Sequence, residues 1–379
     1  MRFEFATATR IVFGAGTVRE VVPAAREMGS RVLLVTGKNP DRAAPIEAEL
    51  GAHAIRIAGE PTLDVIREGL EQARGFQADV VIAFGGGSAI DAGKAIAAMA
   101  TNPGDLLDYL EVIGAGKPLV SPPLPFIAVP TTAGTGSEVT RNAVLSSPEP
   151  HVKVSLRSPQ MLPRLAVVDP GLTVDLPQAD TASTGLDALT QVIEPFVSIR
   201  ANVMTDGFCR EGMRRAVRSL QRAYLHGDDL EARTDMSIVS LLSGLALANA
   251  GLGAVHGFAA PIGGAFDAPH GAICAALLPH ATAVNIQALR SRAPDSEPLR
   301  RYGAVAQILT NDSAAIAGDA PEWLAKTCRA LAIAPLRTYG IRETDIDDLV
   351  SKASRASSMK ANPIVLTDHE LHEVLERAI

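Results

Sequence analysis

The sequence predicts an N-terminal α/β domain with a Rossmann-like parallel sheet over residues 1–180 and an all-helical domain over residues 181–379. In the first half, short apolar runs alternate with amphipathic stretches, which is the pattern of a parallel sheet covered by helices. Beyond about residue 180 the strand-like runs stop and long helical patterns follow. A chain of 379 residues is also long enough to build two hydrophobic cores.

The expected strands of the first domain are apolar runs that end at a glycine, a proline or a polar residue. They cover residues 31–36, 54–57, 78–84 and 125–130. The stretches DRAAPIEAELGA, DVIREGLEQARG and SAIDAGKAIAAMA are expected to be helices, because their apolar residues recur at helical spacing. In the second domain, helical patterns cover residues 203–225, 230–250, 270–290, 298–311, 313–332 and 343–357.

The composition excludes several classes of protein. A formal charge of -7 without a cluster of basic residues argues against nucleic acid or an acidic membrane as a partner. The three cysteines are widely spaced and form no CxxC pair, so neither a disulfide framework nor a thiolate metal site is expected. The start of the chain lacks a basic segment followed by an apolar one, and no run reaches the roughly 18 apolar residues of a membrane span. We therefore expect a cytoplasmic protein that does not enter membranes.

The stretch FGGGSAIDAGK joins a buried strand to a helix through three consecutive glycines. Glycines let a backbone approach a ligand closely, and the N-terminus of the following helix presents free N–H groups and a partial positive charge. Gly86, Gly87 and Ser88 are therefore candidates for holding a diphosphate. Asp91 and Lys94 are three residues apart on the helix and are expected to face the same ligand. The alternative is a tight turn with close helix packing.

A second loop, PTTAGTGSEVT, also follows a strand and is rich in hydroxyl groups and glycines. Hydroxyl and backbone donors in this loop can complete a nucleotide site. Two such loops at the carboxyl ends of strands agree with where open α/β sheets bind ligands. The candidate residues are Thr131, Thr132, Thr135, Ser137 and Thr140.

Two histidines, His256 and His270, flank a segment broken by prolines and glycines. These breakers predict one helix that ends near His256 and a second that starts near His270. Two imidazoles on separate rigid elements can converge on a metal ion. The alternative interpretation is that both are polar residues at helix ends.

A third ligand candidate lies in TASTGLDALTQVIEPFVS, where Ser183 or Thr184 is expected to cap a helix. Asp187 and Gln191 are four residues apart on it and share a face. An aspartate that points inward from an apolar helix is costly unless it is paired or binds a cation. Asp187 therefore favours the metal interpretation.

Five segments in this order resemble the iron-containing, or group III, alcohol dehydrogenases, in the superfamily of glycerol dehydrogenase and dehydroquinate synthase. They are GGGSAIDAGK, PTTAGTGSEVT, LAVVDP, GLDALTQVIEPFVS and VHGFAAPIGGAFDAPHG, and the resemblance covers nearly the whole chain. It implies a nucleotide-binding α/β domain, a helical domain, and a catalytic cleft between them that contains a divalent metal.

The resemblance also implies roles for individual residues. Asp187, His256 and His270 would bind the metal and act in catalysis. Gly86, Gly87 and Ser88 would hold the cofactor diphosphate, Thr131, Thr132 and Thr135 would line the nicotinamide side, and Lys153 would approach the cofactor from the next strand.

Three positions depart from the usual pattern of the family. Many members carry a further ligand histidine where this chain has Gln191, and a second histidine where it has Ala260. A neutral amide is a weaker ligand than an imidazole, so Gln191 is a weak candidate for the fourth metal ligand. Where an acidic residue usually binds the adenosine ribose, this chain has Gly37 followed by Lys38. Loss of a negative charge and gain of a positive one favours NADP slightly over NAD.

The expected activity is reversible hydride transfer between NAD(P)(H) and an alcohol with its aldehyde or ketone. The expected metal is Fe²⁺, with Zn²⁺ as the alternative, and the resemblance implies a homodimer. Two other functions stay open: a metal-dependent cyclase or lyase of the dehydroquinate synthase type, and a nucleotide-binding protein with impaired catalysis. The first needs basic residues for a phosphorylated substrate, and no lysine or arginine occurs between Gly251 and Ala288.

Overall fold

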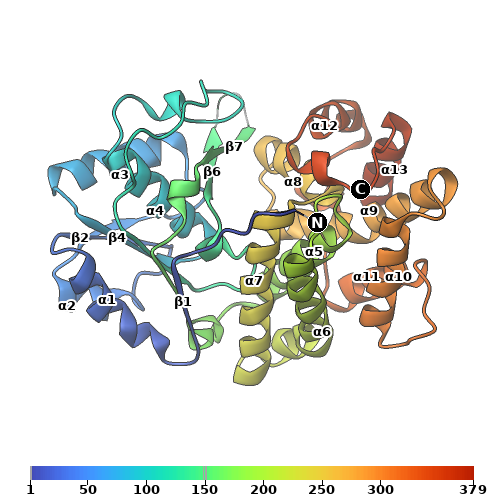
Figure 1. Cartoon of the computed structure of the whole chain (residues 1–379), viewed down its shortest axis with the longest axis horizontal. Helices are drawn as coiled ribbons and strands as arrows, with labels where there is room; N and C mark the ends of the chain where they lie inside the picture. The colour runs from blue at the N-terminus through green and yellow to red at the C-terminus, as the bar shows by residue number, and fades with distance from the viewer. Residues whose placement is uncertain (1, 148, 150–151) are drawn as a thin grey trace. The chain divides into compact units, whose positions relative to one another are not determined.

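The computed structural model describes residues 2–147, 149 and 152–379 and divides into two compact units (Figure 1). The α/β unit consists of Ala6–Thr132 and Gly136–Thr173. The helical unit consists of Val174–Ile379, joined by Ala133–Thr135 and the first few residues of the chain. The predicted fold class, a parallel α/β domain followed by an all-helical domain, is confirmed.

The α/β unit is built on a six-stranded parallel sheet in the order β1-β8-β5-β4-β2-β3. The two central strands β4 and β5 are buried throughout because helices cover both faces. The strands are β1 (Arg10–Phe13), β2 (Val32–Thr36), β3 (His53–Arg56), β4 (Val80–Gly85), β5 (Phe126–Pro130) and β8 (Leu165–Val168).

Side chains of β2 alternate between two hydrophobic cores, one on each face of the sheet. Leu33 and Val35 belong to the core formed with α3 (Leu63–Gly75) and α4 (Gly87–Ala100). Leu34 belongs to the core formed with α1 (Val21–Met28) and α2 (Ala44–Leu50). Figure 1 shows these two pairs of helices on opposite faces of the sheet.

A two-stranded antiparallel hairpin, β6 (Asn142–Ser147) and β7 (Val152–Arg157), packs on α4. This hairpin, β1 and β8 are additional to the four strands predicted from apolar runs. β6 buries only alternate residues and β1 is a half-buried edge strand, so neither forms a continuous apolar run.

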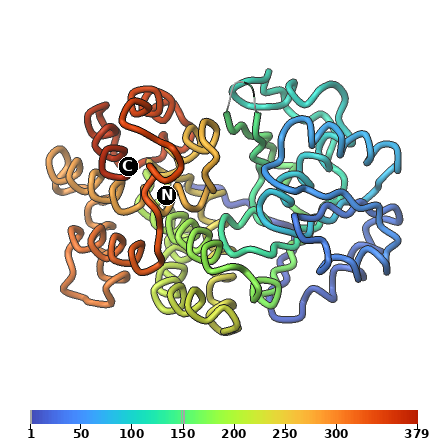
Figure 2. Tube along the Cα trace, turned by 180° about the vertical axis from the view of Figure 1, so that it is seen from behind, coloured from blue at the N-terminus to red at the C-terminus, as the bar shows by residue number. Residues whose placement is uncertain are grey.

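The helical unit contains nine α-helices among the described residues, drawn from green to red in Figure 2. They are α5 (Gln178–Val197), α6 (Val203–Leu225), α7 (Leu230–Ala250), α8 (Ala254–Ala265), α9 (His270–Arg292), α10 (Glu297–Thr310), α11 (Asp319–Ala330), α12 (Ile346–Ala353) and α13 (Asp368–Ala378). They enclose one large apolar core.

Several helix boundaries differ from the prediction, and two of them bear on the candidate metal ligands. α5 begins at Gln178, so Ser183 and Thr184 lie inside the helix and donate to the carbonyl oxygen of Asp180 instead of capping it. The predicted helix over residues 230–250 is α7, but His256 does not end a helix: it lies in the first turn of α8, which follows α7 after a bend of 100°. α8 continues through Pro261 to Ala265, although prolines and glycines usually end helices.

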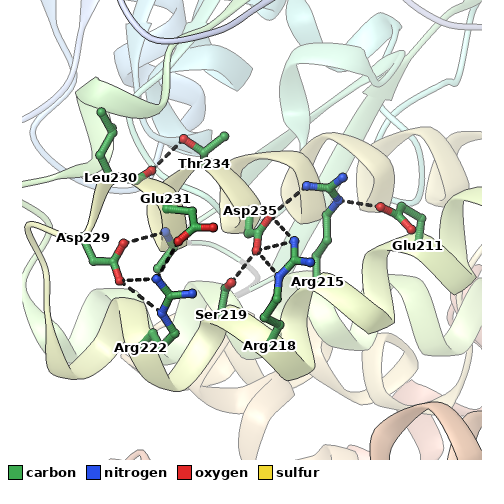
Figure 3. Close-up of polar contacts among 11 residues, drawn as sticks. Glu211, Arg215, Arg218, Ser219, Arg222, Asp229, Leu230, Glu231, Thr234 and Asp235 are labelled. Atoms are coloured by element: carbon green, nitrogen blue, oxygen red, sulfur yellow. Dashed lines mark hydrogen bonds and ion pairs between the residues drawn. The ribbon is translucent and has the colours of Figure 1, made fainter. Parts of the chain in front are cut away.

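Helices α6 and α7 are joined by a buried carboxylate (Figure 3). Asp235 accepts hydrogen bonds from Arg215, Arg218 and Ser219. Burial raises the pKa of Asp235, but the hydroxyl and the two guanidinium groups lower it more, so its pKa lies below the usual value. The ionised carboxylate holds two long helices together at a point separate from the candidate metal ligands.

Helix α9 has the length and mean hydropathy of a membrane-spanning helix, which was not expected from the sequence. However, 83% of its most apolar 18-residue window is buried inside the structure. Helix α9 is therefore a core helix of the helical unit.

Candidate metal centre and cofactor loops

Four metal-binding side chains meet inside the helical unit. Asp187 lies on α5, His256 on α8, and His270 and Cys274 on α9. One ligand atom from each lies within 4.8 Å of every other. The structure thus brings three of the four sequence-derived ligand candidates together and adds a cysteine.

Close contact between two helices places His270 beside Asp187. A Cβ added at Gly271, in the first turn of α9, would lie 2.6 Å from the carbonyl oxygen of Ser183 on α5. Such a contact is well inside van der Waals distance, so only glycine lets the two backbones approach this closely.

Glu194 fixes the position of His256. Glu194 was not among the site residues predicted from the sequence. Its Oε1 accepts a hydrogen bond from the backbone N–H of Val255 at 2.7 Å, in the first turn of α8. Its Oε2 lies 2.7 Å from Nδ1 of His256. One carboxylate therefore both caps the helix and orients the imidazole, with Nε2 directed toward Asp187. A carboxylate behind a histidine ligand is a common arrangement in metal sites. Asp187 and Glu194 are seven residues apart, two helical turns, and this spacing was the available signal.

Oδ1 of Asp187 lies 3.3 Å from Nε2 of His256 and 3.7 Å from Nε2 of His270. The side chain is only 2% exposed, and within the described part of the chain Oδ1 forms no hydrogen bond of normal geometry. A buried carboxylate oxygen in this state is costly unless a cation satisfies it. The donor set and this oxygen fit a divalent metal ion.

The cluster includes a cysteine, although no thiolate metal site was expected from the sequence. Sγ of Cys274 lies 3.7 Å from Nε2 of His256 and 3.7 Å from Nε2 of His270. The expectation was based on the absence of CxxC spacing. Cys274 instead follows His270 by four residues, which places both on one face of α9.

Burial and close approach shift the pKa values of this cluster. Burial raises the pKa of Asp187, but His270 and His256 outweigh it and the pKa is lowered. Burial lowers the pKa of His256, but Cys274 and the two carboxylates outweigh it and the pKa lies well above its usual value. Burial raises the pKa of the Cys274 thiol to about 12. The metal-free cluster therefore holds protons that a bound metal ion displaces.

Gln191 is buried one turn after Asp187 on α5. Its amide nitrogen donates to the carbonyl oxygen of Gly134 at 3.4 Å. Ser243 also donates to this carbonyl oxygen, at 3.2 Å. The amide of Gln191 is thus fixed by a backbone segment of the same unit.

The glycine-rich loop of the α/β unit lies where the sequence predicted it, between β4 and α4. Gly86 is the N-cap of α4 and has no side chain with which to cap the helix. Gly86, Gly87 and Ser88 are partly exposed, so the N–H groups of the first turn are accessible. A Cβ at Gly85 would lie 2.7 Å from Cβ of Ala89, so the turn also needs glycine for its own packing.

The residues expected to face a ligand from α4 are used inside the α/β unit. The side chain of Lys94 is 0% exposed, and its Nζ donates to the carbonyl oxygen of Ser137 and the hydroxyl of Thr140, both at 3.0 Å. It also lies 3.3 Å from Asp91, which accepts a hydrogen bond from the N–H of Val144. The expectation that Asp91 and Lys94 face a ligand is wrong, because both are buried on the side of helix α4 that the β6–β7 hairpin covers.

The remaining cofactor candidates occupy several positions. Thr131 and Thr132 are partly exposed after β5, and Thr132 lies beside Gly86. Thr135 is partly exposed and belongs to the helical unit. Lys153 lies on β7 with Nζ 3.0 Å from Glu60.

Gly37 and Lys38 follow β2, and Lys38 is exposed. Arg56, at the end of β3, donates to the carbonyl oxygen of Lys38. The sequence did not single out this second exposed cation.

A parallel α/β unit with an accessible glycine-rich loop and a helical unit with an Asp/His/His/Cys cluster define the class of metal-dependent dehydrogenases. Residues 8–170 match the family "Iron-containing alcohol dehydrogenase". Residues 181–379 match "Fe-containing alcohol dehydrogenase family, C-terminal". The chain belongs to the iron-containing alcohol dehydrogenase family.

Individual relatives agree with this assignment. The 1,3-propanediol dehydrogenase of Klebsiella pneumoniae is 34% identical, with 92% of each chain covered. The NAD-dependent methanol dehydrogenase of Bacillus methanolicus is 30% identical, with 97% of each covered. A crystal structure of a 1,3-propanediol oxidoreductase superposes with a TM-score of 0.90 and 32% identity over 100% of both chains. The prediction of a metal-dependent alcohol dehydrogenase is thereby confirmed.

Proposed function

We propose that this chain transfers a hydride between NAD(P)(H) and an alcohol with its aldehyde or ketone. Its divalent metal, Fe²⁺ or Zn²⁺, would be held by Asp187, His256 and His270. The observation that carries the proposal is the buried Oδ1 of Asp187, which lies among two imidazole nitrogens and a thiol without a hydrogen bond of its own in the described structure.

The metal, when bound, supplies Lewis acidity that polarises a carbonyl group or favours an alkoxide. The protein supplies position. Glu194 fixes the ring of His256, and the contact at Gly271 fixes the start of α9. His270 is the most exposed of the three ligands, with 32% of its side chain accessible against 6% for His256 and 2% for Asp187. We therefore expect a small substrate to approach from the His270 side.

Hydride chemistry belongs to the nicotinamide cofactor. In the α/β unit, Gly86, Gly87 and Ser88 would bind its diphosphate through the uncapped N-terminus of α4. Thr131, Thr132 and Thr135 would contact the nicotinamide side, and Lys153 would approach from β7. The naming of one relative as NAD-dependent supports this class of cofactor.

We further propose that the enzyme accepts NADP. No carboxylate follows β2 directly, since Gly37 and Lys38 occupy this position. Arg56 places a second exposed cation beside Lys38. Two cations without a carboxylate favour a ribose 2′-phosphate.

We also propose a cytoplasmic homodimer. Cys209, Cys274 and Cys328 are all buried and free, which suits a reducing compartment. Dimerisation is proposed from the family resemblance, and light scattering after size-exclusion chromatography measures it.

The decisive test combines metal removal with a nicotinamide absorbance assay over a panel of aldehydes. A chelator should abolish turnover, and added Zn²⁺ or Fe²⁺ should restore it. Undiminished activity in the metal-free enzyme would overturn the proposal. A protein that takes up no metal and shows no turnover, whichever metal is offered, would instead favour a nucleotide-binding protein with impaired catalysis.

A paired substitution locates the metal. Asp187→Asn should lower metal content by at least ~10-fold, because it removes the anionic ligand. Asp180→Asn changes an exposed aspartate in the first turn of the same helix and should leave metal content unchanged.

A further inference from the structure

Of the three cysteines, Cys274 is the one whose thiol lies in the metal cluster. Its Sγ is 3.7 Å from Nε2 of both His256 and His270. Cys209 is part of the apolar core, and Cys328 donates to the carbonyl oxygen of Ala275. A buried cysteine is usually a small apolar side chain, but Cys274 faces two imidazoles and a carboxylate.

We propose that Cys274 binds the metal as a thiolate, in the ligand position that Gln191 cannot fill as strongly, and that this donor set selects Zn²⁺ over Fe²⁺. The inference deepens the proposed function and rests on it for the presence of a metal at Asp187, His256 and His270.

The distances within the cluster match a tetrahedral zinc site. With bonds of about 2.3 Å to sulfur and about 2.0 Å to nitrogen or oxygen, tetrahedral geometry separates sulfur from nitrogen by roughly 3.5 Å and nitrogen from oxygen by roughly 3.3 Å. The observed separations are 3.7 Å from Sγ to each Nε2, and 3.3 Å and 3.7 Å from Oδ1 of Asp187 to Nε2 of His256 and of His270, with every pair within 4.8 Å. The cluster can therefore hold an ion at its centre, and a substrate oxygen polarised by that ion would be a fifth ligand, a coordination number that catalytic zinc can reach.

Charge balance supports a thiolate at this position. The Asp187 carboxylate and a Cys274 thiolate carry two negative charges, which neutralise a divalent ion in a buried site. With a neutral thiol, one positive charge would stay uncompensated among these four ligands. A coordinated thiol loses its proton to the metal, so the high pKa of a buried thiol does not prevent binding.

Gln191 is a poor competitor for this ligand position. Its amide nitrogen donates to the carbonyl oxygen of Gly134, and its amide oxygen is a neutral ligand. Two imidazoles, one carboxylate and one thiolate are all good ligands for zinc, and a given site of this type binds Zn²⁺ more tightly than Fe²⁺. The thiolate adds to this preference because soft sulfur ligands suit zinc.

Cobalt(II) reports sulfur ligation directly. The wild-type protein loaded with Co²⁺ should show visible d–d bands of a bound ion and a near-ultraviolet band of sulfur-to-cobalt charge transfer. Cys274→Ser should keep the visible bands and lose the charge-transfer band. Cys328→Ser is the matched control, since it removes another buried thiol, and it should keep both features.

The outcomes separate this inference from the proposed function. Visible bands without a charge-transfer band in the wild type, or a charge-transfer band that survives Cys274→Ser, would overturn the inference alone. Absence of both features in the wild type would overturn the metal site and the inference together.

Metal selection is measured by competition, with zinc and iron(II) offered at equal concentration under anaerobic conditions. Wild-type protein should retain zinc, with a Zn–S distance of about 2.3 Å in X-ray absorption. Cys274→Ser should lower zinc affinity by at least ~10-fold and reduce the preference for zinc. Preferential iron(II) binding by the wild type would contradict the inference.

The double variant Cys274→Ser/Gln191→His guards against a simple folding defect. The added imidazole supplies a fourth strong ligand from α5, four residues after Asp187. This variant should recover zinc affinity relative to Cys274→Ser while still lacking the charge-transfer band. Failure to recover affinity in a folded protein would argue that the fourth ligand position is not shared by Cys274 and Gln191.

Discussion

Oε2 of Glu194 lies 2.7 Å from Nδ1 of His256, and both side chains are buried. The other oxygen of the same carboxylate accepts the N–H of Val255. Glu194 thus connects the start of α8 with the orientation of a metal ligand, although it lies about sixty residues earlier in the chain.

Glu194→Gln should lower metal affinity by about 10- to 100-fold, the range found when partners of ligand histidines are changed. The amide cannot accept from both Val255 and His256, so the ring loses its fixed orientation. Competition with a chromogenic chelator measures the affinity. Glu231→Gln, at a residue with 76% of its side chain exposed on α7, should leave it unchanged. Equal affinities for wild type and Glu194→Gln would show that Glu194 acts only as a helix cap.

Gly271→Ala should destabilise the helical unit by about 1–3 kcal/mol and weaken metal binding. The added methyl group would lie 2.6 Å from the carbonyl oxygen of Ser183, which forces α9 and His270 away from α5. Urea denaturation measures the free energy of unfolding.

Gly303→Ala provides the control, because Gly303 lies inside α10 with nothing within 4 Å of an added Cβ. Alanine has the higher helix propensity, so this variant should be as stable as the wild type or up to ~1 kcal/mol more stable. A Gly271→Ala protein with unchanged stability and metal affinity would show that α5 and α9 can separate without cost.

The order of the main elements and three metal-binding candidates were predictable because they depend on local patterns. Buried strands of a parallel sheet are continuous apolar runs, and β2, β4 and β5 were found in this way. Asp187 was found because an acidic residue on an apolar helix is unusual.

The start of α8 was not predictable from neighbouring residues. Its N-cap, Gly253, has no side chain to cap the helix. The first N–H groups instead donate hydrogen bonds to the side chains of Glu194 and Asn362, which are distant in sequence. Tertiary contacts also explain why Pro261 does not end the helix, since most of α8 is buried in the core of the helical unit.

Cys274 was missed for a different reason. CxxC spacing is typical of a loop that surrounds a metal, and the sequence contains no such pair. On a helix the matching spacing is three or four residues, and His270 and Cys274 have it. Lys94 was misplaced because its sequence position gives no sign of the hairpin that covers α4.

Gly37→Asp should lower kcat/KM for NADPH by at least ~10-fold while NADH is retained, since a carboxylate repels the 2′-phosphate and binds the ribose hydroxyls. The substitution is sterically allowed, because an added Cβ would lie 3.9 Å from its nearest neighbour, Cα of Gly85. Steady-state kinetics with both cofactors measure the ratio. Gly37→Asn, of nearly equal size without charge, should change the ratio far less. An equal loss of kcat/KM with NADPH and with NADH would show that the adenosine ribose does not bind beside Gly37.

Glu138→Gln should reduce the pH dependence of stability. Glu138 is buried in the loop after β5, and desolvation raises its pKa to about 7, although Lys94 and a backbone hydrogen bond oppose the shift. An acid whose pKa is raised on folding stabilises the folded state fully below its unfolded pKa, near 4.5, and this stabilisation is lost as pH rises through about 7. The glutamine amide of the variant stays neutral across this pH range, so the variant does not show this loss of stability.

The wild type should therefore lose about 3 kcal/mol more stability than Glu138→Gln between pH 4.5 and 7.5, an order-of-magnitude value from the shift in pKa. Urea denaturation of both proteins across this pH range measures the difference. Glu71→Gln, at an exposed position on α3, controls for the loss of one carboxylate and should follow the wild type. Parallel curves for wild type and Glu138→Gln would show that Glu138 is ionised at little cost in the folded protein, with Lys94 as its compensating charge.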